Sequence, residues 1–520
     1  MNGPVAQAIL LAASLAALVI GAIRWLRVAQ REHYLAGSVT RFARRWWSSG
    51  PNRLLGAAGV VGLIAAAFKV IPAGLVAVGA VAVGPFGLSL RGRTAKLHWT
   101  RRLRTLAAVG MAVVALLVGV AAAGGGLQLA AATATLLAVA VPLVVDVALL
   151  VTGPLERRIG RKFVEQAAGR LRAAHPTVVA ITGSYGKTGT KGYINHLLTG
   201  TRTVVATPAS FNNRAGLARA LNEHLVPGTE VFVAEMGTYG PGEIRDMCAW
   251  CPPDIAVITA VGPVHLERMG TEDRIAAAKA EILERAGVAV INIDNPWLAP
   301  LAAQAEAEGK RVWRCSAVDR AADVCVVRDG DSLAVHVLVP GGPTSAEIAR
   351  ASGLDAPATN LACAVAVALE LGVTPDQVAK RLPSLPTAAH RRQVIAGPTG
   401  ATIIDDTYNA NPAGAAAALD LLERLGRHAA RRVVVTPGMV ELGPRQSEEN
   451  IRFAQAAGKV ATDLLVVGQT NAGALLDGAG GAPATVVRVA NREQAVAWVS
   501  ARVAPGDVVL YENDLPDHFP

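Results

Sequence analysis

The sequence predicts an α/β protein that carries a block of transmembrane helices at its N-terminus. Three observations predict this fold class: an apolar first part of the chain, an alternation of Val/Ile-rich runs with Ala/Leu-rich stretches from His175 onward, and a glycine-rich loop at 182–188 between such a run and a helix. We expect four segments: a membrane domain (1–153), a basic linker (154–174), a central P-loop ATP-binding domain with a mostly parallel sheet (175–385) and a C-terminal Rossmann-like α/β domain (386–520).

The composition places the apolar excess at the N-terminus. The chain has 520 residues, is 52% hydrophobic and 17% charged, and carries a net charge of +10; its mean hydropathy of +0.36 is high for a soluble enzyme. Five segments are long and apolar enough to span a bilayer. They are Val5 to Ile23, Leu54 to Val70, Ala73 to Leu90, Leu106 to Ala123 and Leu127 to Val151, of which the second and third are short enough to form a re-entrant hairpin instead.

The basic residues indicate how these segments cross the membrane. Two Arg-rich loops, 24–53 and 91–104, lie between hydrophobic segments, and the positive-inside rule places both in the cytoplasm. Five spans would then place the N-terminus outside and the domains after residue 174 inside, as expected of a multi-pass protein of the cell membrane. No basic residue precedes the first segment, so we expect no cleavable signal peptide. Because the Arg residues cluster between apolar segments and not on an aromatic-studded face, we expect the lipid bilayer as a partner and no nucleic acid.

The cysteines indicate a reducing compartment. The chain has five, an odd number without the spacing of a disulfide framework. Cys248 and Cys251 form a lone CxxC, for which we favour two apolar side chains at a helix end over a redox or zinc site, since no second pair accompanies them.

The loop at 182–188 has the features of a phosphate-binding loop. Gly183 and Gly186 allow backbone N–H groups to turn toward a polyphosphate, and the following helix adds its positive N-terminus. Lys187 would neutralise phosphate oxygens and Thr188 would hold Mg²⁺. Ile181 stands where the common eight-residue loop has its first glycine, so this loop is a shortened variant. We therefore expect ATP as cosubstrate.

Three further side chains are candidates for metal binding and catalysis. Glu235 directly follows the apolar run 231–234, at the end of an expected strand, where a carboxylate beside a nucleotide loop is a natural Mg²⁺ ligand. His265 follows another such run, and Lys279 lies in a helical stretch with few other charges. Taken singly, each also has an ordinary reading as a surface carboxylate, a loop histidine or a solvated lysine.

Several ordered motifs together resemble one family. The loop at 182–188, the segments 208–216, 235–244 and 258–267, the stretch Asp405-Asp406-Thr407-Tyr408-Asn409-Ala410-Asn411-Pro412, and 438–443 are similar to stretches of the Mur ligases. These are ATP-dependent amide ligases that build peptidoglycan stem peptides, and the branch adding D-alanyl-D-alanine to the UDP-N-acetylmuramoyl tripeptide is the most similar. The resemblance covers roughly Thr177 to Val509.

The resemblance implies a role for each matching residue. Lys187 and Gly186, with Gly183 and Ser184, would hold the phosphates. Thr188 and Glu235 would bind one Mg²⁺, and His265 and Lys279 a second, with Lys279 carbamylated in the manner of the family's lysine. Asn360, Arg391 and Asp406 would contact the nucleotide, and Asn212, Asn213, Tyr408, Asn409 and Asn411 the substrates. The family reaction forms an acyl phosphate, which an amine then attacks.

The chain also departs from the family pattern. The residues before Asn360 differ from the usual Gly-x-His-Asn, the C-terminal lysine-glycine-serine-arginine stretch is replaced by Tyr511 to Asp517, and the soluble uridine-binding domain is replaced by the apolar N-terminus. We therefore expect a membrane-anchored carboxylate–amine ligase of envelope biosynthesis, joining an amino acid or dipeptide to a lipid-linked acceptor. The alternatives are D-alanyl-D-alanine addition to the UDP-linked precursor, a poly-γ-glutamate-type synthase, and a non-catalytic nucleotide-binding transporter or scaffold. The sequence indicates no oligomeric state.

Overall fold

The protein was analysed as a computed structural model, which describes residues 3–67, 71–90, 92, 96–339, 345–386, 390–408, 410–516 and 518–519. The chain divides into two units. Unit 1 comprises Met1–Gly160 together with Leu515–Pro520, and unit 2 comprises Arg161–Asp514. Each unit is described by itself.

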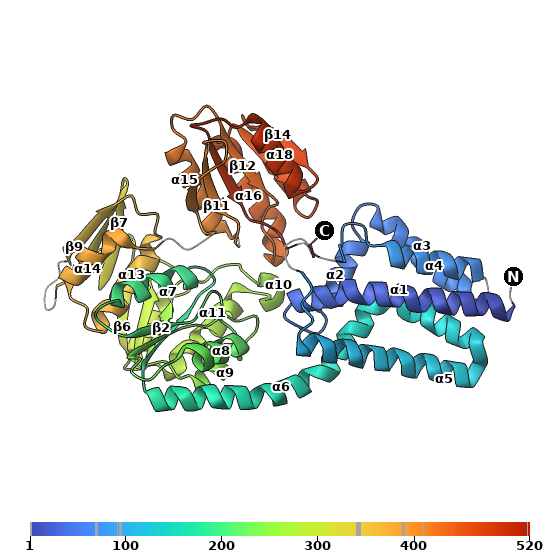
Figure 1. Ribbon diagram of the computed structural model, residues 1–520. Coiled ribbons are helices and arrows are strands. Elements are labelled where there is room, and N and C mark those ends of the chain that lie inside the picture. Colours follow the sequence, from blue (N-terminus) through green and yellow to red (C-terminus); the bar gives the residue numbers. More distant parts are fainter. Residues whose placement is uncertain are drawn as a thin grey trace. The chain divides into compact units, whose positions relative to one another are not determined.

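The secondary-structure elements of unit 1 are all helices in its described residues. Its helices are α1 (Pro4–Arg31), α2 (Ser38–Trp47), α3 (Asn52–Ala67), α4 (Ile71–Val83), α5 (Arg101–Val139) and the first part of α6 (Val141–Ala174). Figure 1 shows α1 between the α3–α4 pair and α5, and the contacts of α1 with α4 and α5 agree. The expected linker 154–174 lies within α6, which contains Pro154 and continues into unit 2.

The helices of unit 1 match the expected apolar segments, but their lengths differ. Two of the described helices, α1 and α5, are long and apolar enough to cross a membrane. Helices α3 and α4 have 16 and 13 residues and pack against each other, an arrangement compatible with two short spans and with the re-entrant hairpin; residues 68–70 of the expected second span lie outside the described part of the chain. The expected fifth segment, 127–151, is divided at Ala140 between α5 and α6. Helix α5 is itself interrupted at Gly125 and Gly126, whose backbone dihedrals are non-helical.

Asp146, an acidic residue within the expected fifth segment, has a structural role. Its carboxylate accepts hydrogen bonds from the backbone N–H groups of Gly37 (2.9 Å) and Thr40 (2.8 Å) and from the Thr40 hydroxyl (2.5 Å). These donors lie at the start of α2, where backbone N–H groups have no partner within the helix. Asp146 therefore caps α2, and its burial needs no transport function.

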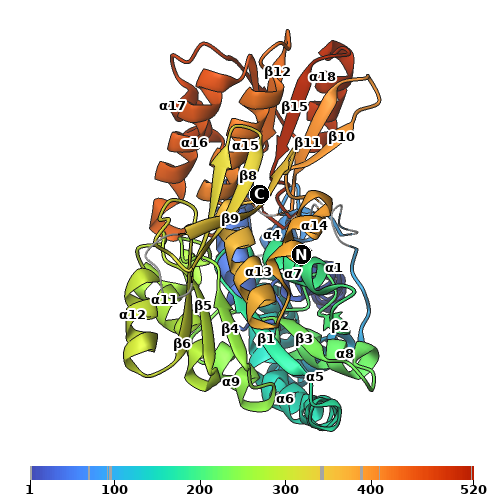
Figure 2. The same ribbon diagram turned by 90° about the vertical axis from the view of Figure 1, so that its left-hand side faces the viewer.

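Unit 2 contains two α/β domains, the first of which is built on a nine-stranded sheet. Its strand order is β2-β3-β1-β4-β5-β6-β7-β8-β9, with parallel pairing from β2 to β7 and antiparallel pairing from β7 to β9. Figure 2 shows β3, β1, β4, β5 and β6 side by side. The strands are β1 (Thr177–Thr182), β2 (Val204–Ala206), β3 (Val231–Glu235), β4 (Ile255–Ile258), β5 (Val288–Asn292), β6 (Arg311–Ser316), β7 (Val324–Asp329), β8 (Ser332–Leu338) and β9 (Ser345–Ser352).

Helices cover both faces of this sheet, which is why its central strands are buried on both sides. The helices are α7 (Lys187–Leu198), α8 (Arg214–His224), α9 (Glu243–Trp250), α10 (Leu266–Met269), α11 (Glu272–Ala280), α12 (Ala299–Ala307), α13 (Ala358–Glu370) and α14 (Pro375–Arg381). One apolar cluster includes side chains of α8, α9 and α11, and the other includes side chains of α7 and α13.

The C-terminal domain has a six-stranded sheet in the order β10-β11-β15-β12-β13-β14. Only β10 is antiparallel among these strands. The elements are β10 (Gln393–Ala396), β11 (Thr402–Asp406), α15 (Pro412–Leu425), β12 (Arg432–Thr436), α16 (Gln446–Val460), β13 (Asp463–Val467), α17 (Ala472–Ala479), β14 (Thr485–Val489), α18 (Arg492–Arg502) and β15 (Val508–Glu512). The prediction of two α/β domains with mostly parallel sheets is confirmed.

The cysteines behave as apolar side chains. All five are free and buried. Burial raises the pKa of the Cys248 thiol to about 12 and raises that of Cys251 further, so neither is a reactive thiolate at neutral pH. The interpretation of this CxxC pair as apolar filler agrees with the structure.

Candidate active site

The glycine-rich loop lies where β1 ends and α7 begins. β1 pairs with β3 on one side and β4 on the other, so the loop emerges at the carboxyl end of a central parallel strand, where ligands of such sheets bind. Gly186 caps α7 with a φ of +85°, and Gly183 has a φ of +156°. A Cβ atom on Gly183 would lie 2.0 Å from Thr259 Oγ1, and one on Gly186 would lie 2.5 Å from Asn360 Oδ1. Both positions therefore require glycine.

Lys187 is the first residue of α7 and bends back over the loop. Its ammonium donates a hydrogen bond of 2.5 Å to the Gly183 carbonyl. Burial lowers the pKa of Lys187 to about 8, which Glu235 opposes and Arg391 reinforces. The fold thus keeps this ammonium away from water in a position where phosphate oxygens would be strong acceptors.

Glu235 is the centre of the most complete cluster in the site. It ends β3 opposite Ile181 of β1, and its side chain is 1% exposed. Its carboxylate accepts hydrogen bonds from the Thr188 hydroxyl (3.1 Å), the Lys191 ammonium (2.8 Å) and the Asn212 amide (3.1 Å). Burial alone would raise the pKa of Glu235, but the cations and these hydrogen bonds outweigh it and lower the pKa below its usual value.

Lys191 belongs to this cluster but was not among the residues predicted from the sequence. Its side chain is buried, and its ammonium also donates to the Ala209 carbonyl at 2.5 Å. One signal could have found it: Lys191 stands four residues after Lys187, and residues at this spacing lie on the same face of a helix.

The second expected metal site is not assembled in the same way. His265 precedes α10 in a left-handed conformation, with φ at +60°, and its Nδ1 lies 2.5 Å from Glu441 Oε2, on the loop after β12. Lys279 is 4% exposed on α11, and burial lowers its pKa well below the usual value, with Lys187 adding to the effect. Among the residues that the structure describes, no hydrogen bond or ion pair reaches the Lys279 ammonium. Burial therefore shifts the Lys279 amine toward its neutral form.

A cavity of about 860 Å³ adjoins the phosphate loop, lined by both domains of unit 2. Its lining includes Gly186, Asn360, Arg391, Asp406 and Asn411, so it collects all three residues predicted to contact the nucleotide. Burial raises the pKa of Asp406 to about 6, although Arg392 and Arg391 lower it. A cavity of this size accommodates a nucleotide.

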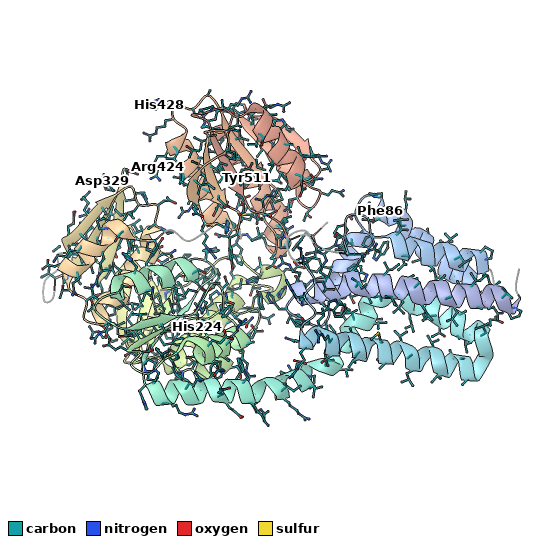
Figure 3. All side chains as sticks on the ribbon, in the orientation of Figure 1. Phe86, His224, Asp329, Arg424, His428 and Tyr511 are labelled. Carbon is teal, nitrogen blue, oxygen red and sulfur yellow. The ribbon has the colours of Figure 1, made fainter. Side chains whose placement is uncertain are left out.

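Ion pairs join the two domains of unit 2 beside this cavity. Asp355, which belongs to the stretch that departs from the family pattern before Asn360, lies 3.3 Å from the Arg392 guanidinium and 3.6 Å from that of Arg424. Arg424, labelled in Figure 3, also lies 3.7 Å from Asp331, on the hairpin where Asp329 is labelled. The altered sequence thus supplies a carboxylate to the C-terminal domain's arginines.

The remaining predicted residues have mixed positions. Asn213 and Asn411 are the N-cap residues of α8 and α15, and each accepts a hydrogen bond of 2.9 Å from a backbone N–H within the first turn. The Tyr408 hydroxyl forms a hydrogen bond with Ser210, and the Arg391 guanidinium lies 4.5 Å from the Tyr408 ring centroid. The Ser184 hydroxyl donates to the Gly262 carbonyl at 3.1 Å. Asn409 lies outside the described residues.

The segment that replaces the family's C-terminal basic stretch contains a buried carboxyl group. Glu512 ends β15 opposite Asp406 and is fully buried, and the Thr436 hydroxyl donates a hydrogen bond to it. Burial raises the pKa of Glu512 to about 8, to which Asp406 contributes and which the Thr436 hydrogen bond opposes.

The residues present fit ATP and one Mg²⁺ ion. The phosphate loop has no room for a Cβ where backbone must approach a phosphate, and Lys187 supplies a cation. Within the described part of the chain, no group of three or more His, Cys, Asp or Glu side chains forms a ready metal site. Thr188 and Glu235 together offer oxygen ligands, which suits Mg²⁺, because this ion is usually bound by one or two carboxylates plus substrate phosphates and water.

Two family models match the chain in the regions just described. The Mur ligase middle domain matches residues 181–368, and the Mur ligase glutamate ligase domain matches residues 390–511. The UDP-N-acetylmuramoyl-tripeptide--D-alanyl-D-alanine ligase of Mycobacterium tuberculosis is 34% identical over 378 residues, which are 67% of this chain and 72% of that enzyme. The enzyme of the same name from Bacillus subtilis is 32% identical over 270 residues, covering 51% of this chain and 57% of its own length.

Solved structures agree with these sequence matches. MurF from Acinetobacter baumannii superposes with a TM-score of 0.58 at 26% identity, covering 68% of this chain and 76% of its own. MurF from Thermotoga maritima, solved in complex with ADP, superposes with a TM-score of 0.57 at 27% identity. The match covers 68% of this chain and 80% of that protein. The phosphate loop, the Glu235 cluster and the adjoining cavity all fall within the matched domains. The chain therefore belongs to the Mur ligase family and is an ATP-dependent, ADP-forming ligase.

Proposed function

We propose that this chain is a membrane-anchored Mur ligase that joins a carboxylate of a cell-envelope precursor to an amino acid or dipeptide at the cytoplasmic face. The observation that carries this proposal is the combination of a complete phosphate-binding end in unit 2 with an apolar helical unit 1. The family resemblance implies a soluble uridine-binding domain at that end of the chain, whereas the described residues of unit 1 are helices and connecting loops.

The outward-facing side chains of unit 1 support membrane anchoring. In α5, only 17% of the most hydrophobic window is buried, although a core helix of a soluble protein would be mostly buried. Large apolar side chains on several helices are exposed, among them Leu54 (78%), Leu116 (66%) and Leu150 (65%). An exposed apolar surface of this kind is typical of a region that contacts lipid. This supports contact of unit 1 with a lipid bilayer.

In the proposed reaction, the γ-phosphoryl group of ATP is transferred to an oxygen of the acceptor carboxylate, releasing ADP. The amine then attacks the acyl carbon, the bond to the phosphate oxygen breaks, and phosphate leaves with formation of the amide. Lys187 would stabilise the charge on the transferring group, and Thr188 and Glu235 would hold a Mg²⁺ ion that neutralises phosphate charge. Lys191 would keep Glu235 ionised and in position.

The second metal site depends on a modification of Lys279. A neutral amine reacts with carbon dioxide to give a carbamate, which is an anionic oxygen ligand. The lowered pKa of Lys279 favours the neutral amine. We propose that the carbamate and His265 would then hold a second ion. His265 would have to exchange its contact with Glu441 for the metal, or use its other ring nitrogen.

The residues that line the cavity indicate where the nucleotide and the substrates would bind. Asn360, Arg391 and Asp406 would face ATP in the 860 Å³ cavity. Asn212, Tyr408 and the segment around Asn411 would lie on the substrate side.

The acceptor is the finer part of the proposal. Membrane helices in place of the uridine-binding domain favour a lipid-linked acceptor. A second candidate, addition of D-alanyl-D-alanine to the UDP-linked tripeptide, is favoured by the names of the relatives that are 32–34% identical.

The purified full-length chain in lipid nanodiscs can separate the two candidates. It would be incubated with Mg²⁺-ATP, D-alanyl-D-alanine and either the lipid-linked or the UDP-linked tripeptide, and amide product and released phosphate would be measured. We expect phosphate release with the lipid-linked acceptor to exceed that with the soluble one by at least about tenfold in kcat/KM, a difference of ~1.4 kcal/mol. Turnover of the UDP-linked acceptor alone would remove the lipid proposal. Absence of nucleotide binding would remove the ligase proposal itself.

A further inference from the structure

The last residues of the chain do not belong to the ligase unit. The C-terminal tail, defined here as residues 515–520, falls in unit 1, although the preceding residues 161–514 form unit 2. The chain therefore leaves unit 1 once, within α6, and returns to it at Leu515. This tail is also the continuation of the segment that replaces the family's C-terminal basic stretch.

The described tail residues are held by specific contacts. The Trp46 indole N–H donates a hydrogen bond of 2.8 Å to the His518 carbonyl. The His518 Nε2 lies 3.1 Å from a carboxylate oxygen of Glu32, and both side chains are only 4% exposed. Phe519 meets Phe42 edge to face, with ring centroids 5.0 Å apart at 88°.

These contacts use three kinds of group from His518 and Phe519. A backbone carbonyl, an imidazole and a benzene ring each have a buried partner on α1–α2 or directly after α1. The Arg45 guanidinium lies 5.1 Å from the Phe42 ring centroid and 5.6 Å from that of Phe519, so it covers both rings. Four side chains, Glu32, Phe42, Arg45 and Trp46, therefore contact the described tail residues.

The surface that receives the tail is buried in the docked state. With the tail in place, Phe42 and Trp46 are 2% and 4% exposed, and Glu32 is 3% exposed. Release of the tail would remove the acceptor of the Trp46 N–H and the ring partner of Phe42. The surface formed by Glu32, Phe42, Arg45 and Trp46, called here the tail site, therefore matches the chemistry of a His-Phe peptide.

We propose that the tail site binds the chain's own C-terminal His518-Phe519 and so acts as an intramolecular anchor for the end of the C-terminal ligase domain. Only six residues lie along the chain from Glu512, the last residue of β15, to His518. Six extended residues reach at most about 20 Å. A docked tail is therefore joined to the end of β15 by a short stretch of chain. This anchor is independent of which acceptor the enzyme uses.

A photo-crosslink from the tail tests the proposal in the full-length chain. Phe519 would be replaced by benzoylphenylalanine in detergent-solubilised protein, which would be irradiated, separated by mass and mapped by mass spectrometry. We expect an adduct at monomer mass within residues 28–50. An adduct at dimer mass would show that the tail binds a second copy, and an adduct only within 161–514, or none, would equally overturn the intramolecular anchor. The same probe at Val496, an exposed residue of α18, should give no adduct in 28–50.

Matched tryptophan variants test the hydrogen bond. Trp46→Phe retains a ring but removes the N–H donor, and we expect it to lower the yield of the adduct about fivefold, the factor that corresponds to a hydrogen bond of ~1 kcal/mol. Trp47→Phe changes the neighbouring residue, whose ring lies near Gly56 of α3 and makes no hydrogen bond or ring contact with the tail residues that the structure describes, and should leave the yield unchanged. Equal yields in both variants would contradict the assigned hydrogen bond. Nucleotide binding, measured in parallel, should be the same in all of these proteins, which shows that unit 2 is folded.

Discussion

The Glu235 cluster and the His265–Lys279 pair lie in one domain, yet the fold leaves their charged groups in different states. Around Glu235, the carboxylate already has an ammonium, a hydroxyl and an amide as partners. In the His265–Lys279 pair, His265 contacts a carboxylate of the C-terminal domain, and Lys279 is buried with a strongly lowered pKa. In the proposed function, the first cluster would hold a Mg²⁺ ion with its existing carboxylate. The second would do so only after carbamylation of Lys279.

This difference follows from how each site is built. Glu235, Thr188 and Lys191 lie at the end of one strand and on the first turns of the helix that follows its neighbour, so backbone geometry alone brings them together. His265 depends on a short helix and on the loop of another domain. Contacts between domains rearrange more readily than a parallel sheet, so we expect the second site to respond to ligands and conditions more than the first.

The largest loss of turnover should come from a change in the phosphate loop beside the Glu235 cluster. Lys187→Met removes the cation beside the phosphate loop, and we expect turnover to fall by about 10³-fold, as for the loss of other preorganised electrostatic groups. Phosphate release from ATP in the presence of acceptor and amine measures this. Because a desolvated ammonium is removed, the melting temperature should not fall. Turnover within tenfold of the unchanged enzyme would show that Lys187 is not at the reacting phosphate.

A change at Lys279 should cause a smaller loss of turnover, and the activity of the unchanged enzyme should depend on carbon dioxide. We expect Lys279→Ala to lower turnover by about 10²-fold, since one metal position is lost while the first remains. The unchanged enzyme should lose activity in buffer freed of carbon dioxide and recover it with bicarbonate, whereas the variant should not respond.

Arg274→Ala is the matched control, because Arg274 is an exposed residue of the same helix, α11. It should retain both full activity and the bicarbonate response. Unchanged amide formation in Lys279→Ala would contradict a metal-binding role for Lys279.

A pH experiment extends the comparison to the buried carboxyl group of the C-terminal domain. The folded-state pKa of Glu512, about 8, lies above its value in an unfolded chain, so the folded protein holds the extra proton between these two values. Stability should therefore decrease as pH rises from about 4.5 to 8. Glu512→Gln should remove this part of the pH dependence, on the order of 5 kcal/mol for a pKa difference of about 3.5 units at ~1.4 kcal/mol per unit.

Melting temperatures of both proteins between pH 5 and pH 8.5 measure the effect. The curve of the variant should be flatter than that of the unchanged protein. Parallel curves would mean that Glu512 is ionised and stabilised in the fold, as Glu235 is.

The smallest expected effects separate structural asparagines from substrate-binding ones. Asn411→Ala removes the N-cap of α15 and should cost about 1 kcal/mol in the free energy of unfolding. Asn411→Asp retains a capping oxygen and should restore stability. If the KM of the acceptor rises in both variants, the amide also binds substrate, whereas a KM that is unchanged in Asn411→Asp assigns Asn411 to helix capping alone.

The sequence was sufficient for those parts of the structure that depend on local pattern. The strands that carry the phosphate loop and Glu235 alternate so regularly with helices that their order, and the loop between β1 and α7, could be predicted. The hairpins β7 to β9 were not predicted, since their pairing depends on contacts between strands that do not follow a βαβ repeat. Lys191 was missed because a helix lysine is usually solvated.

Contacts between distant segments could not be predicted either. The hydrogen bond between His265 and Glu441 joins residues 176 positions apart, and no spacing rule indicates it. The short helices α3 and α4 show a related limit, because hydropathy identifies an apolar segment but not whether it crosses or turns back. The docking of His518 onto α1–α2 depends on groups almost 500 residues apart in the sequence.

The acyl-phosphate mechanism is tested most directly by following the carboxylate oxygen of the acceptor into the released phosphate. The acceptor tripeptide, lipid-linked or UDP-linked, would be labelled with ¹⁸O in its terminal carboxylate and turned over with Mg²⁺-ATP and amine, and the released phosphate would be analysed by mass spectrometry. Because an acyl phosphate forms and is broken at the carbon–oxygen bond, we predict one ¹⁸O atom in the phosphate for each amide formed. Phosphate that contains no label while amide accumulates would contradict this mechanism and the roles assigned to Lys187 and Glu235.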